Sequence, residues 1–245
     1  MNERRHDNGR ITGFMPSNSV KRRYMFISNH IQSAVHWWSA ENSPDNDVRS
    51  LLPFLFENID ALYFSITQFP EKWSCESLMG IHNSGKYNRY FKMGLNPRDT
   101  VILRSAISLS GDVYCIVKRL SNIDSKSLQP AIDNLLTELD KYRKLRNFFA
   151  HFDDRITNLD RHGITGAKTT ECGINYTEQT VGCFHMAMTG NTFHFCSEGN
   201  AETIEVGKDN FIEIINAIEP IYLEIISHKL HGDTSQYPVF SDIFP

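Results

Sequence analysis

Apolar residues recur at steps of three and four positions over long stretches of the chain, which is the spacing that gives an α-helix one buried face. Such stretches run from 24 to 40, from 48 to 69 and from 97 to 120. Pro97 suits a helix start, because the first helical N–H groups have no partner inside the helix. Pro53 falls near the start of its stretch, where proline is tolerated or marks a kink. The pattern therefore predicts one short helix followed by two longer ones.

The next helical stretch, from about 128 to 154, carries a charged residue on its apolar side. That side is formed by Ile132, Leu135, Leu136, Leu139, Tyr142, Phe149 and Phe152. Arg146 falls on the same side. A cation is rarely buried without a partner, so Arg146 must reach solvent, meet a carboxylate, or face a cleft that receives an anion.

The pattern changes between about 160 and 207, where glycines recur among Thr, Val, Ile and Phe. This composition predicts short strands joined by turns, and we expect a small antiparallel β-meander from about 164 to 206. Helical spacing returns after Asp209, and Pro220 should kink this last helix. The three longer helical stretches and this last one predict a mainly α fold of the α+β kind, a four-helix bundle with a small antiparallel β-meander inserted before the last helix.

Two regions lack a clear periodic pattern. Residues 1–24 are polar and basic, so we interpret them as a mobile or loosely docked N-terminal arm. Residues 25–245 are then expected to form a single domain. Within it, residues 70–96 contain several prolines and glycines and are expected to be irregular.

Charge and composition restrict the classes of function. The chain has 25 Lys and Arg against 29 Asp and Glu, a net charge of −4, which argues against non-specific coating of nucleic acid and requires any such contact to be local. No apolar run reaches the roughly 18 to 20 residues that span a bilayer, and the N-terminal segment lacks the apolar core of a signal peptide. The 5 cysteines, an odd number at irregular spacing, indicate reduced thiols. We therefore expect a cytoplasmic protein.

The predicted meander contains one arrangement that could bind metal. If its hairpin turns at Thr189-Gly190, Cys183 faces Cys196 and His185 faces His194, and all four side chains share one face of the sheet. Two thiols and two imidazoles could hold zinc, although the usual short ligand spacing is absent. The alternative is a partly exposed strand face that is rich in Cys and His. Nothing else in the sequence indicates a cofactor.

The usual catalytic motifs are absent, which leaves Arg146 and His151 as the candidate site. The chain has no phosphate-binding glycine loop, dinucleotide fingerprint, His-Glu-x-x-His or Gly-x-Ser-x-Gly. RNA can be cleaved without metal, because its 2′-hydroxyl attacks the adjacent phosphate and the enzyme need only move protons and stabilise phosphate charge. Histidine and arginine are suited to these two tasks. The neighbouring basic residues Lys141, Arg143 and Lys144 are candidates for binding the substrate.

The segment Arg146-Asn147-Phe148-Phe149-Ala150-His151 resembles the signature of the HEPN superfamily, an Arg followed by a polar residue and then by His after four to six intervening positions. The resemblance implies a helical bundle with the motif near the end of a long helix. It also implies a metal-independent endoribonuclease of a toxin–antitoxin, abortive-infection or phage-defence system, with RNA as substrate and an antitoxin or regulatory protein as a partner. By this resemblance Arg146 stabilises phosphate, His151 acts in acid/base catalysis and Asn147 orients them, within a homodimer whose two motifs meet in one cleft.

Within the family, the segment through Asp153 is similar to the abortive-infection type. One variant of the family carries a nucleotidylated Tyr two residues after the His; Asp153 occupies that position here, so regulation by that route is not expected.

A straight helix would separate the two candidate catalytic residues. Arg146 and His151 would point about 140° apart, so they need a kink near the motif or a second subunit to act on one phosphate. Otherwise Arg146 pairs with a carboxylate and His151 caps a helix C-terminus. A non-catalytic HEPN module that binds RNA or a partner protein, and a purely structural helical domain, are the alternative functions.

Overall fold

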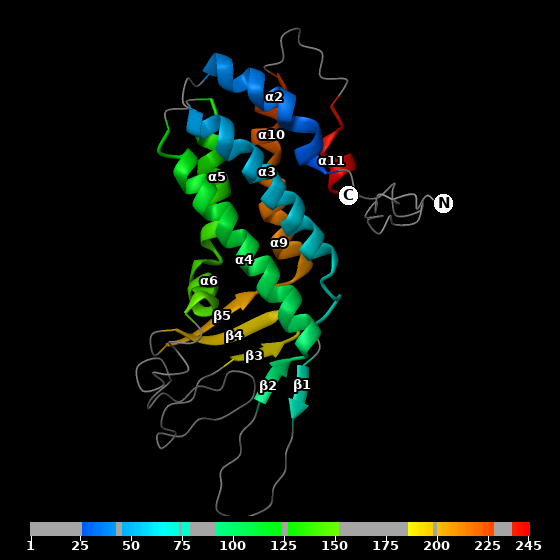
Figure 1. Cartoon of the computed structure of the whole chain (residues 1–245). Coiled ribbons are helices and arrows are strands. Elements are labelled where there is room, and N and C mark those ends of the chain that lie inside the picture. Colours follow the sequence, from blue (N-terminus) through cyan, green and yellow to red (C-terminus); the bar gives the residue numbers. More distant parts are fainter. Residues whose placement is uncertain are drawn as a thin grey trace, which may run out of the picture.

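The computed structural model describes residues 26–42, 46–73, 75–78, 92–123, 127–151, 186–197, 200–227 and 237–245. In these residues the chain is mainly helical, with a small antiparallel sheet before the last helices, as the sequence predicts (Figure 1). The predicted N-terminal arm, residues 1–24, lies outside the described residues.

The helices and strands are named as in Figure 1. The helices are α2 (Ile27–Asn42), α3 (Asn46–Thr67), α4 (Pro97–Leu120), α5 (Gln129–Asp140), α6 (Arg143–Ala150), α9 (Lys208–Asn216), α10 (Glu219–Ser227) and α11 (Phe240–Ile243). The strands are β1 (Cys75–Leu78), β2 (Lys92–Leu95), β3 (Met186–Thr189), β4 (Thr192–Ser197) and β5 (Asn200–Glu205).

The long helices lie side by side, and the strands gather at one end of them (Figure 1). α3 packs against α2, α4 and α9, while α4 also packs against α5 and α6. Large apolar side chains fill the space between these elements. The largest fully buried ones include Trp38, Phe56, Phe148, Phe193, Phe195, Phe211 and Tyr222.

The start of α2 is held by a carboxylate from α3. The side chain of Asp60 accepts hydrogen bonds from the backbone N–H of Ile27 at 3.0 Å and from the backbone N–H and hydroxyl of Ser28 at 3.0 and 2.6 Å. These N–H groups belong to the first turn of α2 and have no partner within the helix. Asp60 is 6% exposed, and burial raises the pKa of its carboxyl above the ordinary value although the hydrogen bonds oppose this.

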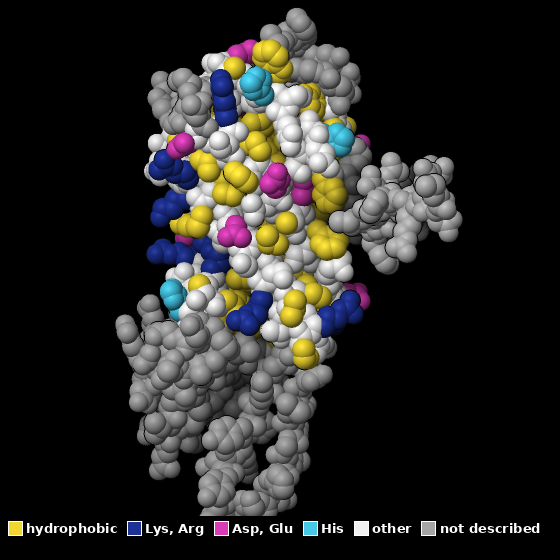
Figure 2. Space-filling view, viewed as in Figure 1, with side chains coloured by type: hydrophobic (Ala, Val, Ile, Leu, Met, Phe, Trp, Pro, Cys, Tyr) yellow, Lys and Arg dark blue, Asp and Glu magenta, His cyan; other side chains and the backbone are white. Residues whose placement is uncertain are grey.

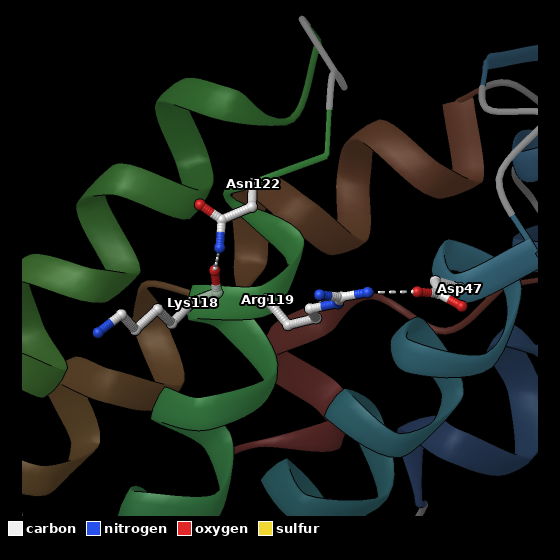
Figure 3. A network of polar contacts seen from close by, with 4 residues as sticks. All are labelled: Asp47, Lys118, Arg119 and Asn122. Carbon is white, nitrogen blue, oxygen red and sulfur yellow. Dashed lines mark hydrogen bonds and ion pairs between the residues drawn. The ribbon is translucent and has the colours of Figure 1, made fainter.

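Helix α4 begins and ends where the sequence predicts. Asn96 caps its first turn by accepting a hydrogen bond from the N–H of Asp99 at 2.8 Å, and Pro97 follows. At the other end, the Asn122 side chain donates to the carbonyl of Lys118 at 2.9 Å (Figure 3). The same view shows Arg119 paired with Asp47 of α3 at 2.8 Å, which joins the end of α4 to the start of α3.

By length and hydropathy, α4 is also the one helix in the described part of the chain that could cross a membrane, with a mean hydropathy of 1.4 over 18 residues. Helices in the core of a protein can have the same length and composition. Here α4 packs against α3, α5 and α6.

The long helix predicted from 128 to 154 is divided into α5 and α6 by a turn at Lys141 and Tyr142. Tyr142 leaves the helical conformation, with φ −96° and ψ 4°, and its buried ring stacks on Phe211 of α9 with 4.4 Å between centroids. The apolar spacing continues through this turn, so periodicity could not reveal it.

Two further expectations are corrected by the strands. The region 70–96, expected to be irregular, contains the antiparallel pair β1–β2, with Cys75 opposite Leu95. The meander is confirmed as β3–β4–β5, although its described part begins only at Met186. Its hairpin turns at Gly190 and Asn191, one residue later than predicted, since Thr189 pairs with Thr192.

This later turn requires a positive backbone φ, which glycine adopts without strain. Gly190 has φ 61°. The register places Ala187, rather than His185, opposite His194.

The last predicted helix is divided as its proline indicates. α9 ends at Asn216, and α10 begins at Glu219, directly before Pro220. A proline lacks the N–H that a helix interior needs, so the break falls next to it. The short helix predicted from 24 to 40 is confirmed as α2, which packs against α3 and α10. The short α11 near the chain end was not predicted.

Candidate functional site

Helix α6, which carries the candidate motif, is held in place by the sheet. Phe148 is fully buried, and its ring lies 5.2 Å from Phe195 and 6.1 Å from Phe193 of β4. Phe149 lies 5.7 Å from Phe193. The meander therefore supplies the aromatic surface on which the short helix of the motif rests.

Arg146 is half-buried and is held by three elements. It belongs to α6, its Nη1 donates to the carbonyl of Leu139 in α5 at 2.5 Å, and its guanidinium carbon lies 4.3 Å from the centroid of the Tyr114 ring in α4. In the described part of the chain no carboxylate forms an ion pair with it. Arg146 was expected to reach solvent, to pair with a carboxylate or to face a cleft for an anion. Among the described residues, the pairing with a carboxylate is not observed.

Arg146 instead faces a cavity between α4 and α6 with a volume of about 320 Å³. The cavity is lined by Arg104, Ile107, Ser108, Gly111, Arg146, Phe149 and Ala150. Burial lowers the pKa of the Arg146 guanidinium, with Tyr114 and Asp140 acting in the opposite direction. Arginine nevertheless stays protonated in proteins, so the cavity contains a desolvated positive charge.

His151 and Asn147 lie on a different side of α6. Ala150 follows Arg146 by four residues and shares its face toward the cavity, whereas Asn147 and His151 form a second pair at the same spacing. Both of these are exposed. His151 is the C-terminal cap residue of α6, and its N–H bonds to the carbonyl of Asn147 at 3.2 Å.

The bend in the helix does not bring the two catalytic candidates together. It lies at Lys141 and Tyr142, before the motif, and α6 runs without a break from Arg143 to Ala150. No bend within α6 thus offsets the roughly 140° that separates positions 146 and 151 on a regular helix. His151 itself is the cap residue, with φ −113° and ψ 32°.

The three candidate substrate-binding residues are all exposed. Lys141 forms an ion pair with Glu138, and Lys144 pairs with Glu202 of β5 at 2.7 Å. Such exposed pairs contribute little, on the order of 0–1 kcal/mol, so both lysines can exchange their carboxylates for phosphates. Figure 2 shows Lys and Arg side chains gathered on the side of the molecule where α5 and α6 lie.

The zinc set stays a prediction. Cys183 and His185 lie outside the described residues, and the side chain of Cys196 is not described. His194 is buried in β4, at 8% exposure. Among the described residues no three Cys, His, Asp or Glu side chains gather as a metal site would require.

Sequence reasoning missed the half of the cavity that α4 provides. Arg104, Ser108 and Gly111 follow one another at steps of four and three residues, so they share one face of the helix. This polar and small stripe was the available signal. The apolar residues that predict α4 do not contain this signal.

Comparisons with protein-family models, with curated proteins and with solved structures gave no match to this chain.

Proposed function

We propose that this chain is a metal-independent endoribonuclease of HEPN type that acts in the cytoplasm in a toxin–antitoxin, abortive-infection or other antiviral defence system. The observation that carries the proposal is the placement of Arg146, a half-buried cation that faces a cavity without an ion-paired carboxylate among the described residues. A desolvated guanidinium interacts strongly with a phosphate, because little water screens the two charges.

The proposed reaction uses the substrate's own nucleophile. The 2′-oxygen of a ribose attacks the adjacent phosphorus, the bond from phosphorus to the 5′-oxygen breaks, and a 2′,3′-cyclic phosphate and a 5′-hydroxyl result. His151 removes the proton of the 2′-hydroxyl or delivers one to the leaving 5′-oxygen. Arg146 stabilises the additional negative charge on the phosphate oxygens, and Asn147 orients the reacting groups.

The proposal requires two copies of the chain. Because Arg146 and His151 lie on different sides of α6, one subunit alone does not direct both at the same phosphate. In a homodimer formed through the helical bundle, the phosphate held by Arg146 of one subunit meets His151 of the other. An antitoxin or regulatory protein that covers the exposed Asn147 and His151 would block such a site.

The proposal is tested by incubating total RNA with the full chain in the presence of EDTA over a broad pH range. The parent should cleave, while the Arg146→Ala and His151→Ala variants should each lose at least about 100-fold in rate, the usual contribution of a charge-stabilising donor and of a general acid or base. An inert parent, or variants as active as the parent, would contradict the proposal.

A second candidate function is a non-catalytic HEPN module that binds RNA or a partner protein. It is favoured by the hydrogen bond from Arg146 to the Leu139 carbonyl, which gives this residue a structural role at the end of α5. This candidate predicts that RNA binds to the parent and is recovered intact. The cleavage assay distinguishes the two functions directly.

A further inference from the structure

The cavity between α4 and α6 is walled by two arginines from different helices. Arg104 comes from α4 and Arg146 from α6. Ser108 of α4 also lines the cavity and carries a hydroxyl group. The remaining lining residues are Ile107, Gly111, Phe149 and Ala150, so no carboxylate lies among the lining residues that the structure describes. Two like charges at one small cavity repel each other, and an anion placed between them lowers this repulsion.

Both guanidinium groups are held against aromatic rings. The Arg146 guanidinium carbon lies 4.3 Å from the Tyr114 ring centroid, and that of Arg104 lies 5.3 Å from the Phe149 ring centroid. A guanidinium that rests on a ring keeps its N–H groups directed outward in its own plane, which is the arrangement that binds two phosphate oxygens at once.

Gly111 allows this arrangement by leaving room for the arginine. A Cβ atom at this position would lie 3.4 Å from Cδ of Arg146, at the limit of ordinary contact. Any larger side chain would therefore displace the Arg146 side chain from the cavity wall.

We infer that this cavity binds one phosphate group between Arg104 and Arg146, with the Ser108 hydroxyl as a third donor. Helix α4 then supplies a cation for phosphate binding that the motif of α6 lacks. The choice of RNA as the source of the phosphate rests on the proposed function; the phosphate site itself does not.

The surrounding charge favours a polymer over a free nucleotide. Arg143 is exposed one turn before Arg146 on the same side of α6, and its charge acts on the Arg146 guanidinium. Arg104, Arg146 and Arg143 thus form a row of cations, which suits consecutive phosphates of an RNA backbone. The volume, about 320 Å³, is at the low end of the range for ligand pockets and suits one phosphate with part of its ribose.

The test measures binding separately from cleavage. A short fluorescent RNA whose 2′-hydroxyl groups are methylated cannot be cut by the proposed reaction, and its dissociation constant follows from fluorescence anisotropy at several salt concentrations. Arg104→Ala should weaken binding about tenfold and lower the slope of log K against log salt by about one. Ser108→Glu should abolish binding, because its carboxylate would occupy the cavity.

The matched control is Arg98→Ala, which removes the same charge from an exposed position of α4 that does not line the cavity. It should change the dissociation constant by less than about twofold. Thermal unfolding of each variant verifies that the fold is intact. If Arg104→Ala binds as Arg98→Ala does, the cavity assignment is overturned.

Competition by inorganic phosphate and by a nucleoside monophosphate identifies the source of the phosphate. A monophosphate that binds as tightly as the oligonucleotide would overturn the assignment to the RNA backbone. The two proposals fail separately. If Arg104→Ala weakens RNA binding but the parent cleaves no RNA, the phosphate site is supported and the nuclease proposal fails. If the parent cleaves RNA but Arg104→Ala binds RNA as the parent does, the nuclease proposal stands and the phosphate site fails.

Discussion

The guanidinium carbon of Arg146 lies 4.3 Å from the centroid of the Tyr114 ring, so a cation of α6 and an aromatic residue of α4 form one stacked pair. The hydrogen bond from Arg146 to the Leu139 carbonyl at 2.5 Å adds α5 to this arrangement. The side chain is thereby fixed before any ligand arrives, which lowers the entropy lost when it binds an anion.

The Tyr114 ring should therefore matter for function although it lies outside the motif. Tyr114→Leu removes the aromatic face and should weaken RNA binding several-fold, since a cation–π contact contributes about 0.5–2 kcal/mol. Tyr114→Phe retains the face and should bind as the parent does. Anisotropy titration of both variants checks this, and equal binding by Tyr114→Leu and Tyr114→Phe would contradict it.

Arg146 and His151 should differ in their effect on stability. Arg146→Ala removes a hydrogen bond to a carbonyl and a stacking contact, and should lower the free energy of unfolding by about 1–3 kcal/mol. His151 is exposed, and His151→Ala should change it by less than about 0.5 kcal/mol. Urea denaturation measures both. A His151→Ala variant that cleaves no RNA yet unfolds like the parent would assign the loss to chemistry.

Mixing two inactive variants should restore cleavage if each site combines two subunits. A heterodimer of Arg146→Ala and His151→Ala contains one site with both residues intact, because each chain provides what the other lacks. The mixture should approach about a quarter of parental activity, since half of the random dimers are mixed and each has one intact site. Either variant mixed with itself is the control. If the mixture stays inactive while the variants still dimerise, the two residues act within one chain or not at all.

The sequence was sufficient for features that repeat along the chain. The bounds of α4 follow from its apolar spacing and Pro97, and the break before α10 follows from Pro220. The sequence was insufficient where contacts between residues far apart in the chain determine where a helix ends. Tyr142 leaves the helix as its ring stacks on Phe211, about 70 residues later in the chain, and no local pattern contains that information.

The same distinction applies to the candidate site. The motif of α6 is contiguous, so Arg146 could be recognised as a misplaced cation from its own helix. Arg104 joins it only through the packing of α4 on α6, which the sequence of either helix does not specify. The pairing register of β3 and β4 also depends on the conformation of one residue. Gly190 has a positive φ, and the hairpin turns one residue later than the sequence predicted.

Removal of the carboxylate that holds α2 should be costly. Asp60→Ala leaves the fully buried N–H of Ile27 without its partner and removes the cap of the helix, so the free energy of unfolding should fall by about 2–3 kcal/mol. Asp47→Ala is the control, because it removes a carboxylate from a pair whose side chains are 63% and 52% exposed. That variant should lose less than about 1 kcal/mol. Equal losses in the two variants would contradict the assigned role of Asp60.

The titration of Asp60 should also make stability depend on pH in a defined direction. Burial raises the pKa of its carboxyl above the ordinary value of 3.8. Between pH 3.8 and the pKa of the folded state, the folded protein therefore binds the proton more tightly than the unfolded chain does. The contribution of Asp60 is then complete below pH 3.8 and declines as the pH rises through the pKa of the folded state. Asp60→Asn does not titrate and serves as the reference. The free energy of unfolding of the parent minus that of Asp60→Asn should decrease with rising pH, and an increase would mean that the hydrogen bonds from Ile27 and Ser28 outweigh burial.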